Sequence, residues 1–545
     1  MMALTNISRN RRSDLLCLIF LSVSGTQAAD LPHFRAGNGA VQLLVHGKPF
    51  LIRGGELGNS SAGMAMQADT TLPAMARLHL NTVLVPVAWE QVEPKEGVLD
   101  FSILDHWIDI ARQQHLHLVL LWFGAWKNAF SEYAPDWVKA DMKRFPRAQS
   151  AHGMPTEILS TFGTETLRAD SRAFRSLMAH LREKDQEQQT VLMVQVENEM
   201  GYLGPGRDRS PEADRGFAGP VPQELMGALA ARRTELSPEL AAHFDPQGRV
   251  WREVFGDAAG EVFMAWRYAI FVNSVAEAGK REYPLPMYVN AQLPSLMERP
   301  GEYPSGGPHP YYLAIYRAMA PAIDFYSPDI YWPEFEYWVK RYQISGNPIF
   351  IPKAKMDSAP WNALYAYGAA KAIGFCPFAI DSLQPPASPG DSEPAIMQVY
   401  AAVSSLEDML TVAQNAGRAR GLVLHANGPR ASQSVALGGY VFEASLSRGW
   451  STGSLLTNDG GMLLIESRPD EFFVVGGGLT VKMSRDPDTD GKICGIASIE
   501  EVSRVGAEWA VSARLNGDQS NQGRQLTMDP RKIRTYRVRL YSAAQ

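Results

Sequence analysis

Residues that could do acid/base chemistry follow a short apolar run in the middle of this 545-residue sequence. The segment VQVENEMG places Asn198 and Glu199 directly after the run. A half-buried glutamate in such a place has a raised pKa and can protonate a leaving-group oxygen, and the neighbouring amide can bond a substrate hydroxyl. A structural carboxylate that caps a loop is the commoner role of this pattern. The rest of the chain nevertheless favours a functional role.

Aromatic and polar side chains occupy the same kind of position after other apolar runs. They are Trp89 and Glu90 in VAWEQVE, Trp122, Trp126, Lys127 and Asn128 in LLWFGAWKNAF, and Tyr331 and Trp332 in PDIYWPEF. Flat rings stack on the apolar faces of sugars, whereas packing in a core is the alternative role for each tryptophan. The pattern therefore indicates a carbohydrate substrate.

The elements that must position these residues are short apolar runs that alternate with longer amphipathic stretches from residue 50 to residue 382, as in repeated βα units. The runs are FLIRGG, NTVLVPV, LHLVLLWF, VLMVQVE, PMYVN, IDFYSPDI, PIFIP and IGFCPFAI. Several are almost wholly apolar, as parallel strands buried on both faces should be. We therefore predict an α/β fold, a (β/α)8 TIM barrel, with its site at the carboxyl ends of the strands. An open doubly wound sheet is the alternative.

A long insertion rich in Gly, Pro and charged residues follows the fourth run, between Asn198 and Pro284. On a barrel this insertion would lie on the face where barrel enzymes build their sites. It would be either a wall of the site or an idle surface loop, and loops of this length are more often functional.

The pattern changes after the linker DSLQPPASPGDSEP. A helical passage at 395–417 is followed by short alternating runs separated by Gly and Asp turns, such as SQSVALGGYVFEASL, GMLLIES and TYRVRLYS. This pattern predicts an antiparallel β-sandwich. We expect a catalytic barrel at 30–390 and a C-terminal β-sandwich domain at 391–545 that supports it structurally.

The first 29 residues have the pattern of a signal peptide. RNRR is followed by the apolar LLCLIFLSVSG and by the small residues of TQAAD. The apolar run is about half of the roughly 20 residues that a membrane-spanning helix needs. We therefore expect a signal peptide at 1–29 and a secreted or periplasmic protein.

Charge and cysteine content limit the partners and cofactors. The formal net charge is −6 at pH 7 and the basic residues are scattered, so we expect neither nucleic acid nor membrane as a partner. Only Cys376 and Cys494 lie beyond the signal, in different predicted domains, and a disulfide is not expected. Metal-ligand spacing and phosphate-binding glycine loops are missing from the sequence, which predicts no cofactor and no metal. The sequence leaves the oligomeric state open.

Several of these segments together resemble a known family. VQVENEMG, WEQVEPKEGVLDF, LWFGAWKN, SPDIYWPEF and GFCPFAIDS resemble secreted bacterial β-galactosidases of glycoside hydrolase family 35 that carry a small C-terminal β-domain. The resemblance implies a clan A barrel enzyme that removes terminal β-linked galactose, with retention, from oligo- or polysaccharides such as xyloglucan. It also implies Glu199 as the acid/base and Asn198 as a contact of the sugar 2-hydroxyl.

The resemblance breaks at the expected nucleophile. Retention needs a second carboxylate about 5 to 5.5 Å from the first, and in this clan it follows the seventh strand. There the sequence reads NPIFIPKAKMD, whereas the family pattern resembles NPLFIPEA, so Lys353 stands at that position. An ammonium group would repel the positive charge of an oxocarbenium-like transition state and would favour the ionised form of Glu199.

Three interpretations follow from Lys353. The chain has lost its nucleophile and its hydrolysis is impaired; or another carboxylate has taken over, with Glu334, Glu336 and Asp357 as the neighbouring choices; or the protein binds galactosides without cleaving them. Lysine is an established nucleophile for carbonyl substrates and not for acetals, which argues against a covalent glycosyl-lysine.

Overall fold

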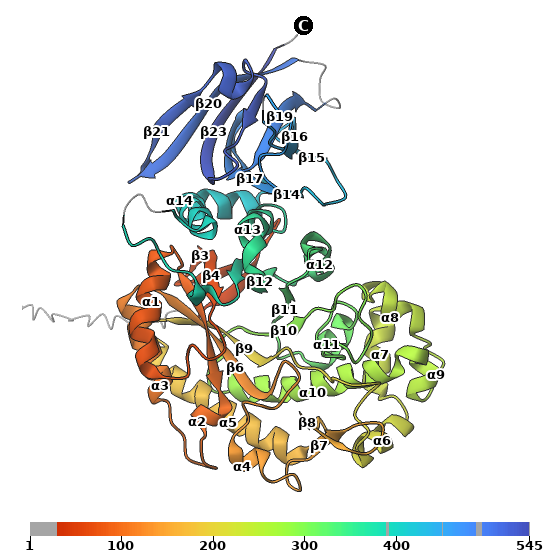
Figure 1. The fold of residues 1–545 in the computed structure, drawn as a ribbon. Helices are drawn as coiled ribbons and strands as arrows, with labels where there is room; N and C mark the ends of the chain where they lie inside the picture. The colour runs from red at the N-terminus through yellow and green to blue at the C-terminus, as the bar shows by residue number, and fades with distance from the viewer. Residues whose placement is uncertain (1–29, 389–391, 450, 487–492, 544–545) are drawn as a thin grey trace, which may run out of the picture.

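The computed structural model describes residues 30–388, 392–449, 451–486 and 493–543. The predicted signal peptide at 1–29 and part of the predicted linker lie outside these residues. Figure 1 shows a barrel domain and a β-rich domain, with α13 (Ala359–Gly368) and α14 (Ala395–Asn415) between them. In the described part of the chain, the helices are too short or too polar to cross a membrane.

Eight parallel strands close into a barrel in the order of the sequence, which confirms the predicted fold class. The strands are β4 (Ile52–Glu56), β5 (Thr82–Ala88), β6 (His117–Lys127), β9 (Val191–Asn198), β10 (Met287–Gln292), β11 (Phe325–Ile330), β12 (Phe350–Ala354) and β13 (Gly374–Pro377). Each lies on one of the eight predicted runs. They are buried at nearly every position because helices cover the outer face of the barrel.

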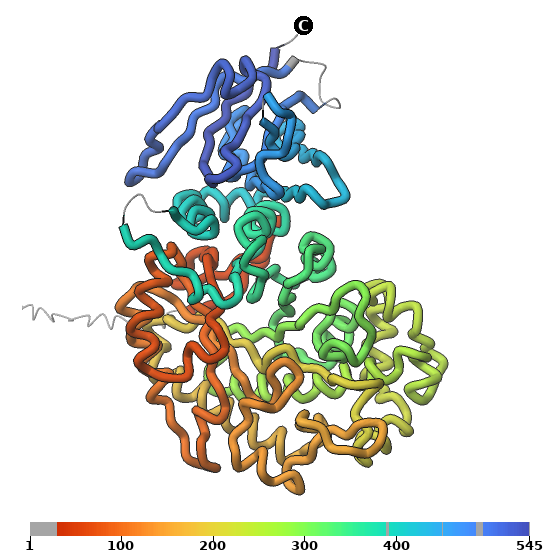
Figure 2. Tube along the Cα trace, viewed as in Figure 1, coloured from red at the N-terminus to blue at the C-terminus, as the bar shows by residue number. Residues whose placement is uncertain are grey.

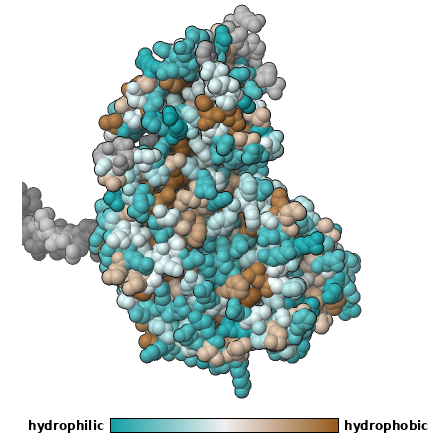
Figure 3. All heavy atoms as spheres, viewed as in Figure 1, coloured by the Kyte–Doolittle hydropathy of each residue, from teal (hydrophilic) through white to brown (hydrophobic). Residues whose placement is uncertain are grey.

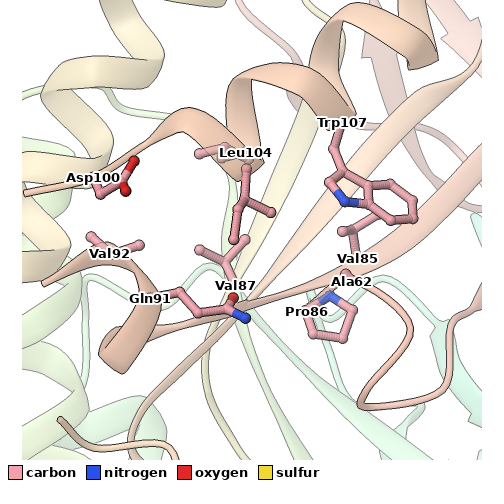
Figure 4. A pocket seen from close by; sticks show the side chains of 10 residues that line it. Ala62, Val85, Pro86, Val87, Gln91, Val92, Asp100, Leu104 and Trp107 are labelled. Atoms are coloured by element: carbon pink, nitrogen blue, oxygen red, sulfur yellow. The ribbon is translucent and has the colours of Figure 1, made fainter. Parts of the chain in front are cut away.

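Helices alternate with the strands around the barrel (Figure 2). They are α1 (Ala68–Arg77), α2 (Trp89–Val92), α3 (Ser102–Gln113), α4 (Asp136–Lys139), α5 (Thr164–Asp185), α10 (Ala259–Lys280), α11 (Leu313–Met319) and α12 (Phe335–Tyr342), followed by α13 and α14. Figure 4 shows how α3 packs: Leu104 and Trp107 point towards Val85 and Val87 of β5. The gap between them, about 20 Å³, has room for roughly one water molecule, so it is a packing defect of this layer.

The insertion after β9 is folded into helices. They are α6 (Pro211–Ala218), α7 (Gln223–Ala231), α8 (Pro238–His243) and α9 (Trp251–Phe255), ahead of the barrel helix α10. Ser210 and Ser237 accept hydrogen bonds from backbone N–H groups of α6 and α8, and a proline follows each serine. Serine caps with proline at the first helical position are strong helix starts, which explains why a segment rich in Gly and Pro is helical. A short hairpin of β7 (Arg147–Gln149) and β8 (Pro155–Leu159) precedes α5.

A small N-terminal sheet closes the other end of the barrel. It consists of β1 (His33–Ala36), β2 (Val41–Val45) and β3 (Lys48–Phe50). Leu43 and Val45 pack with barrel residues that include Phe350, and the rings of Phe34 and Phe325 lie 5.1 Å apart. Because Phe325 and Phe350 begin their strands, this sheet covers the amino end of the barrel and leaves the carboxyl end as the side for a ligand.

The C-terminal part contains two antiparallel sheets, as predicted. In the described residues one has six strands, in the order β14-β17-β18-β23-β20-β21, and the other has four, in the order β15-β16-β19-β22. The strands are β14 (Ala419–His425), β15 (Ser432–Leu437), β16 (Tyr440–Leu446), β17 (Asp459–Arg468), β18 (Glu471–Gly477), β19 (Leu479–Arg485), β20 (Ile493–Val505), β21 (Glu508–Leu515), β22 (Gln525–Thr527) and β23 (Arg534–Ala543). Met462 and Phe472 of the larger sheet share one core with Phe442 and Val481 of the smaller.

The two domains are packed closely. Gly368 at the end of α13 lies against β14, and a Cβ atom at this position would be only 2.2 Å from the carbonyl oxygen of Arg420. The glycine is therefore required by the close approach of the domains. On the face drawn in Figure 3, hydrophilic residues predominate and hydrophobic residues form separate patches.

Candidate active site

A cavity of about 240 Å³ lies at the carboxyl end of the barrel. It is lined by Asn59, Lys127, Asn128, Glu199, Gln292, Tyr331, Lys353 and Phe378. These residues end or follow seven of the eight barrel strands, so side chains far apart in the sequence meet in one place. This is the position of the active site in characterised TIM-barrel enzymes.

The backbone bends sharply where β9 delivers its polar residues. Glu197 and Glu199 both have positive φ angles, 62° and 47°, which are uncommon for residues other than glycine. Glu197 points away from the cavity and accepts a hydrogen bond from the backbone N–H of Trp126 (2.8 Å). The bend lets the side chains of Asn198 and Glu199 both reach the site, although neighbouring residues of a regular strand point to opposite faces. Strain of this kind is concentrated at functional sites.

Lys353 is the centre of the site. Its Nζ atom lies 3.3 Å from an oxygen of Glu199, 3.3 Å from Asp329 and 3.5 Å from Glu56. It also donates a hydrogen bond to Oδ1 of Asn198 at 2.7 Å. The side chains of Lys353 and of the three acidic residues are almost completely buried. Lys353 is therefore the shared counter-ion of three carboxyl groups.

The charges shift the pKa values in different directions. Burial lowers the pKa of Lys353, but the three carboxyl groups outweigh it and hold this pKa well above its ordinary value. Burial raises the pKa of Asp329 well above its ordinary value and that of Glu56 to about 7. Burial also opposes ionisation of Glu199, but Lys353 and a hydrogen bond with Asp329 bring its pKa below the ordinary value. The shifts therefore favour the ionised form of Glu199 and the protonated form of Asp329, which can then donate a hydrogen bond to Glu199.

A second lysine borders the same cavity. Lys127 donates a hydrogen bond to the side-chain oxygen of Asn128. Burial, together with the charge of Lys353, lowers the pKa of Lys127 to about 8. The cavity thus holds two cationic side chains close to its carboxyl groups.

Amide side chains hold the charged groups in place. Asn290 accepts a hydrogen bond from the backbone N–H of Glu199 (3.0 Å) and donates to Asp329 (2.6 Å) and to Asn198 (3.2 Å). Asn198 in turn donates to Asn128 (3.3 Å). The network fixes the side chains before any ligand arrives.

Some polar atoms at the site have no protein partner. Within the described residues, both carboxyl oxygens of Glu56 are buried without a hydrogen bond, apart from the ion pair with Lys353, and Oδ1 of Asn59 is likewise unpartnered. Buried acceptors are normally bonded, so Oδ1 of Asn59, in the cavity lining, is suited to a hydroxyl group of a ligand, whereas Glu56 lies behind the lining and faces Lys353.

Sequence reasoning missed Glu56, Asp329, Asn290 and Gln292. Glu56 directly follows the predicted run FLIRGG, and Asp329 is the one acidic residue near the end of IDFYSPDI. Asp329 is also the register partner of Lys353 in the next strand. Polar residues within or just after otherwise apolar runs were the signal that could have found them.

Three predicted substrate contacts are wrong in their placement. Trp89, Trp122 and Trp126 are fully buried outside the cavity lining. Their indole N–H groups donate to Glu93 (3.1 Å), Asp170 (2.9 Å) and the backbone of Leu159 (3.0 Å), respectively. Large rings at these positions fill the layer around the barrel, where the indole N–H finds an internal partner.

Of the other predicted substrate contacts, some line the cavity and some lie outside it. Asn128 and Tyr331 line the cavity, and the ring of Tyr331 lies 6.2 Å from that of Phe378. Trp332 follows at the rim, 38% exposed, and donates to the backbone of Leu293 (2.9 Å). Glu90 lies outside the cavity lining and pairs with Lys139 on the surface (3.2 Å), so its predicted contact is also wrong in placement.

The carboxylates considered as substitutes for a nucleophile do not line the cavity. The side chain of Asp357 is 87% exposed, and Glu334 and Glu336 lie at the start of α12 in a separate groove. The helical insertion after β9 likewise contributes none of the lining residues in the described chain. These placements contradict a catalytic role for the three carboxylates and a wall-forming role for the insertion.

The two cysteines of the described chain lie outside the cavity lining. Cys376 is buried in β13, and both it and Cys494 are free thiols. Over the described ranges, no group of three His, Cys, Asp or Glu side chains is arranged to hold a metal ion.

The arrangement is unsuited to double displacement. Position 353 has no carboxylate to attack the anomeric carbon, and Lys353 lowers the pKa of Glu199, which makes Glu199 a poorer proton donor. Asp329 is poorly placed to replace the nucleophile, because it is hydrogen-bonded to Glu199 and paired with Lys353 at 3.3 Å. The site can instead bind a neutral molecule rich in hydroxyl groups.

Comparison with known proteins supports a β-galactosidase-like glycoside hydrolase barrel. Residues 62–221 match the family model of the β-galactosidases of glycoside hydrolase family 42, and residues 396–527 match a domain of unknown function. This match supports the predicted likeness to β-galactosidases with a barrel fold. The family whose model matches is family 42, however, and not the predicted family 35. Curated protein sequences gave no match.

Solved structures with a similar fold include two β-galactosidases and a mannanase. The β-galactosidase of Bacillus circulans sp. alkalophilus is 14% identical with a TM-score of 0.44, and the match covers 67% of this chain and 57% of that one. The β-galactosidase of the psychrophilic Marinomonas ef1 is 13% identical with a TM-score of 0.44, and the match covers 66% of this chain and 62% of that one. The β-mannanase of the blue mussel Mytilus edulis is 12% identical with a TM-score of 0.41, and the match covers 69% of this chain and 97% of that one. The matches thus span less than two thirds of these β-galactosidases, and they do not decide a substrate.

Proposed function

We propose that this protein is a β-galactosidase-type glycoside hydrolase whose cavity binds a terminal β-linked galactosyl group, and that Lys353 suppresses the cleavage of this group. The observation that carries the proposal is the position of Lys353, at the end of β12 and in contact with Glu199, Asp329 and Glu56. The family match of residues 62–221 supports the substrate class. The motifs that resemble family 35 support the same class.

The cavity suits one polar ring. Its volume of about 240 Å³ lies just below the range of roughly 300 to 1,000 Å³ for drug-sized ligands. The unpartnered Oδ1 of Asn59 can accept a hydrogen bond from a sugar hydroxyl, while the amides of Asn128 and Gln292 offer both donors and acceptors. Tyr331 and Phe378 provide aromatic walls. The family resemblance assigns the contact with the 2-hydroxyl group to Asn198, which here lies behind the cavity lining and is bonded to Lys353 and Asn128.

Cleavage is suppressed at two steps. In a retaining glycosidase one carboxyl group protonates the leaving oxygen and another attacks the anomeric carbon. Lys353 removes the second group and, through its charge, keeps Glu199 ionised and unable to protonate. We therefore propose galactoside binding with little turnover. With the signal peptide predicted at 1–29, we propose that binding takes place in the periplasm or outside the cell, on galactosides such as xyloglucan.

Binding and turnover are measured separately to test this proposal. Calorimetry should show that galactose binds the full chain more tightly than glucose does. Asn128→Ala should weaken galactose binding several-fold, because one lost hydrogen bond is worth about 1 kcal/mol. Asn516→Ala, at an exposed position of the C-terminal domain, is the matched control and should bind as the wild type does. Hydrolysis of a nitrophenyl β-galactoside should stay near the background rate.

Two results would contradict the proposal. Equal affinity for galactose and glucose would reject the substrate class. Rapid turnover by the wild type would show that another group supplies the missing carboxylate, and Glu56→Gln would then identify whether that group is Glu56.

A further inference from the structure

A second hollow lies between the two domains. It is a groove of about 650 Å³ between the first turns of α12 and the loop that joins β14 to β15. The barrel contributes residues 333–337 and Lys340, and the C-terminal domain contributes residues 423–425, 427–430 and Gln433. In Figure 1 this loop extends above α12. Domain boundaries are common places for ligand sites, and neither domain forms this groove alone.

The groove is adjacent to the cavity. Tyr331 lines the cavity and Pro333 lines the groove, with only Trp332 between them. Consecutive Cα atoms are about 3.8 Å apart, so the Cα atoms of Tyr331 and Pro333 are at most about 7 to 8 Å apart. The exposed ring of Trp332 is held at the border by its hydrogen bond to Leu293. A chain of sugar rings that ends in the cavity could thus continue into the groove.

The charges of the groove favour a neutral ligand. Its acidic side chains are Glu334 and Glu336, and its basic ones, besides His425, are Lys340 and Arg430. Glu336 and Lys340 form an ion pair at 3.6 Å. Two negative and two positive groups give no strong field of one sign, which argues against an anionic polymer as the ligand.

An oriented aromatic ring provides a surface for stacking. Tyr337 is 41% exposed, and its hydroxyl oxygen accepts a hydrogen bond from Arg341 (3.2 Å). Its ring also contacts Trp338 edge-on, with centroids 4.9 Å apart. These contacts fix the ring while one face stays accessible, and the amides of Asn427 and Gln433 lie in the same groove. Aromatic faces beside amides suit a sugar.

We propose that this groove binds the part of a neutral oligosaccharide that adjoins the galactosyl group in the cavity. The inference rests on the proposed function, since that function supplies the ring that anchors the chain. The groove is about 2.7 times as large as the cavity (650 against 240 Å³), so it holds more than one further ring. The C-terminal domain then takes part in substrate selection, which goes beyond structural support.

Three probes separate the groove from the cavity: galactose, a xyloglucan oligosaccharide that ends in galactose, and the same oligosaccharide without its galactose. Calorimetry on the full chain should show tighter binding of the galactosylated oligosaccharide than of galactose. Tyr337→Ala should weaken the oligosaccharide about tenfold and leave galactose unchanged. Asn427→Ala, in an exposed loop where folding is not at risk, should weaken it about threefold. Tyr541→Ala, at an exposed position of β23 outside the groove, should change neither affinity.

Each outcome decides one of the two proposals. An oligosaccharide that binds no more tightly than galactose, or one whose affinity is unchanged in both groove variants, would overturn the groove as a site. Loss of galactose binding in Tyr337→Ala would do the same, because the effect would then not be confined to the groove. If galactose does not bind, while both oligosaccharides bind and depend on Tyr337, the assignment of the cavity fails and the groove stands as a glycan site.

Discussion

Replacement of Lys353 by glutamate tests the main feature of the site. We expect Lys353→Glu to hydrolyse a nitrophenyl β-galactoside at least about a thousand times faster than the wild type. The new carboxylate would stand at the end of β12 and could attack the anomeric carbon, and Glu199 would lose its ion pair with Lys353. The assay is the release of nitrophenol by the full chain. Proton NMR of the first product should show β-galactose, as retention requires.

The expected gain has two parts. The Nζ atom of Lys353 lies 3.3 Å from Glu199, and at an effective dielectric constant near 20 this pair is worth about 5 kcal/mol in favour of the ionised carboxylate. Without the cation Glu199 can hold a proton, and general acid catalysis typically contributes about 10²- to 10⁴-fold. The restored nucleophile adds a further gain, so a thousandfold increase is a lower bound.

Variants at neighbouring positions separate these parts. Lys353→Met removes the charge without adding a nucleophile and should gain far less activity than Lys353→Glu. Lys355→Glu makes the same charge change two residues away, where the side chain is 57% exposed, and should stay at background. Glu199→Gln should abolish the activity gained by Lys353→Glu. A folded Lys353→Glu protein that binds galactose but does not cleave galactosides would refute the assignment of position 353.

Three further predictions concern the same charged cluster. Lys353→Met removes the ammonium group that pairs with three buried carboxyl groups, so the free energy of unfolding should fall by about 3 to 5 kcal/mol at pH 8. The loss should be smaller at pH 5, where the carboxyl groups take up protons. Urea titrations measure the loss, with Lys355→Met as the control. An equal loss at both pH values would contradict this prediction. The pKa of Glu56 is raised from 4.5 to about 7, so the folded state binds more protons than the unfolded state between these values and stability falls as the pH rises through this window. Glu56→Gln should therefore stabilise the protein by up to about 3 kcal/mol more at pH 8 than at pH 5, again measured with urea, and a pH-independent effect would refute the shift. A galactose analogue with a cationic ring nitrogen should bind the wild type more weakly than galactose does, because Lys353 already neutralises the carboxyl groups. In Lys353→Glu the analogue should bind more tightly than galactose, as measured by calorimetry. The same order of affinities in both proteins would contradict this prediction.

The fold was largely predictable because burial leaves a direct trace in the sequence. Parallel strands covered on both faces are apolar along most of their length, and all eight strands lie on predicted runs, several of which are almost wholly apolar. Elements with one face in solvent leave a weaker trace. Strand β21 alternates between exposed and half-buried positions and was missed. The helices of the insertion were missed because their Gly and Pro content resembles a loop, although the serine caps at Ser210 and Ser237 were visible.

The site was predictable in part. The end of a strand fixes how far along the barrel a residue lies, and this was enough to find Glu199 and Asn128, whereas Lys353 was found through the family resemblance. It does not fix the direction of the side chain. Trp122 lies on β6 near the same end of the barrel, yet its ring points away from the cavity and bonds to Asp170. Direction depends on strand tilt, on bends such as those with positive φ, and on the available partners, which are properties of the assembled barrel.

Stability and catalysis make opposite demands on residue 353. Glu56, Glu199 and Asp329 converge from three strands into a space where each is almost completely buried. A glutamate at 353 would add a fourth carboxyl group, and the folded protein would have to protonate several of them or carry uncompensated buried charge. A lysine supplies the missing cation, and its Nζ atom reaches all three groups at 3.3 to 3.5 Å. On the proposed assignment of position 353 to the nucleophile, the lysine found there stabilises the remaining cluster, which is the trade-off between stability and activity expected at a catalytic centre. On this reasoning Lys353→Glu should be both the more active and the less stable protein at neutral pH.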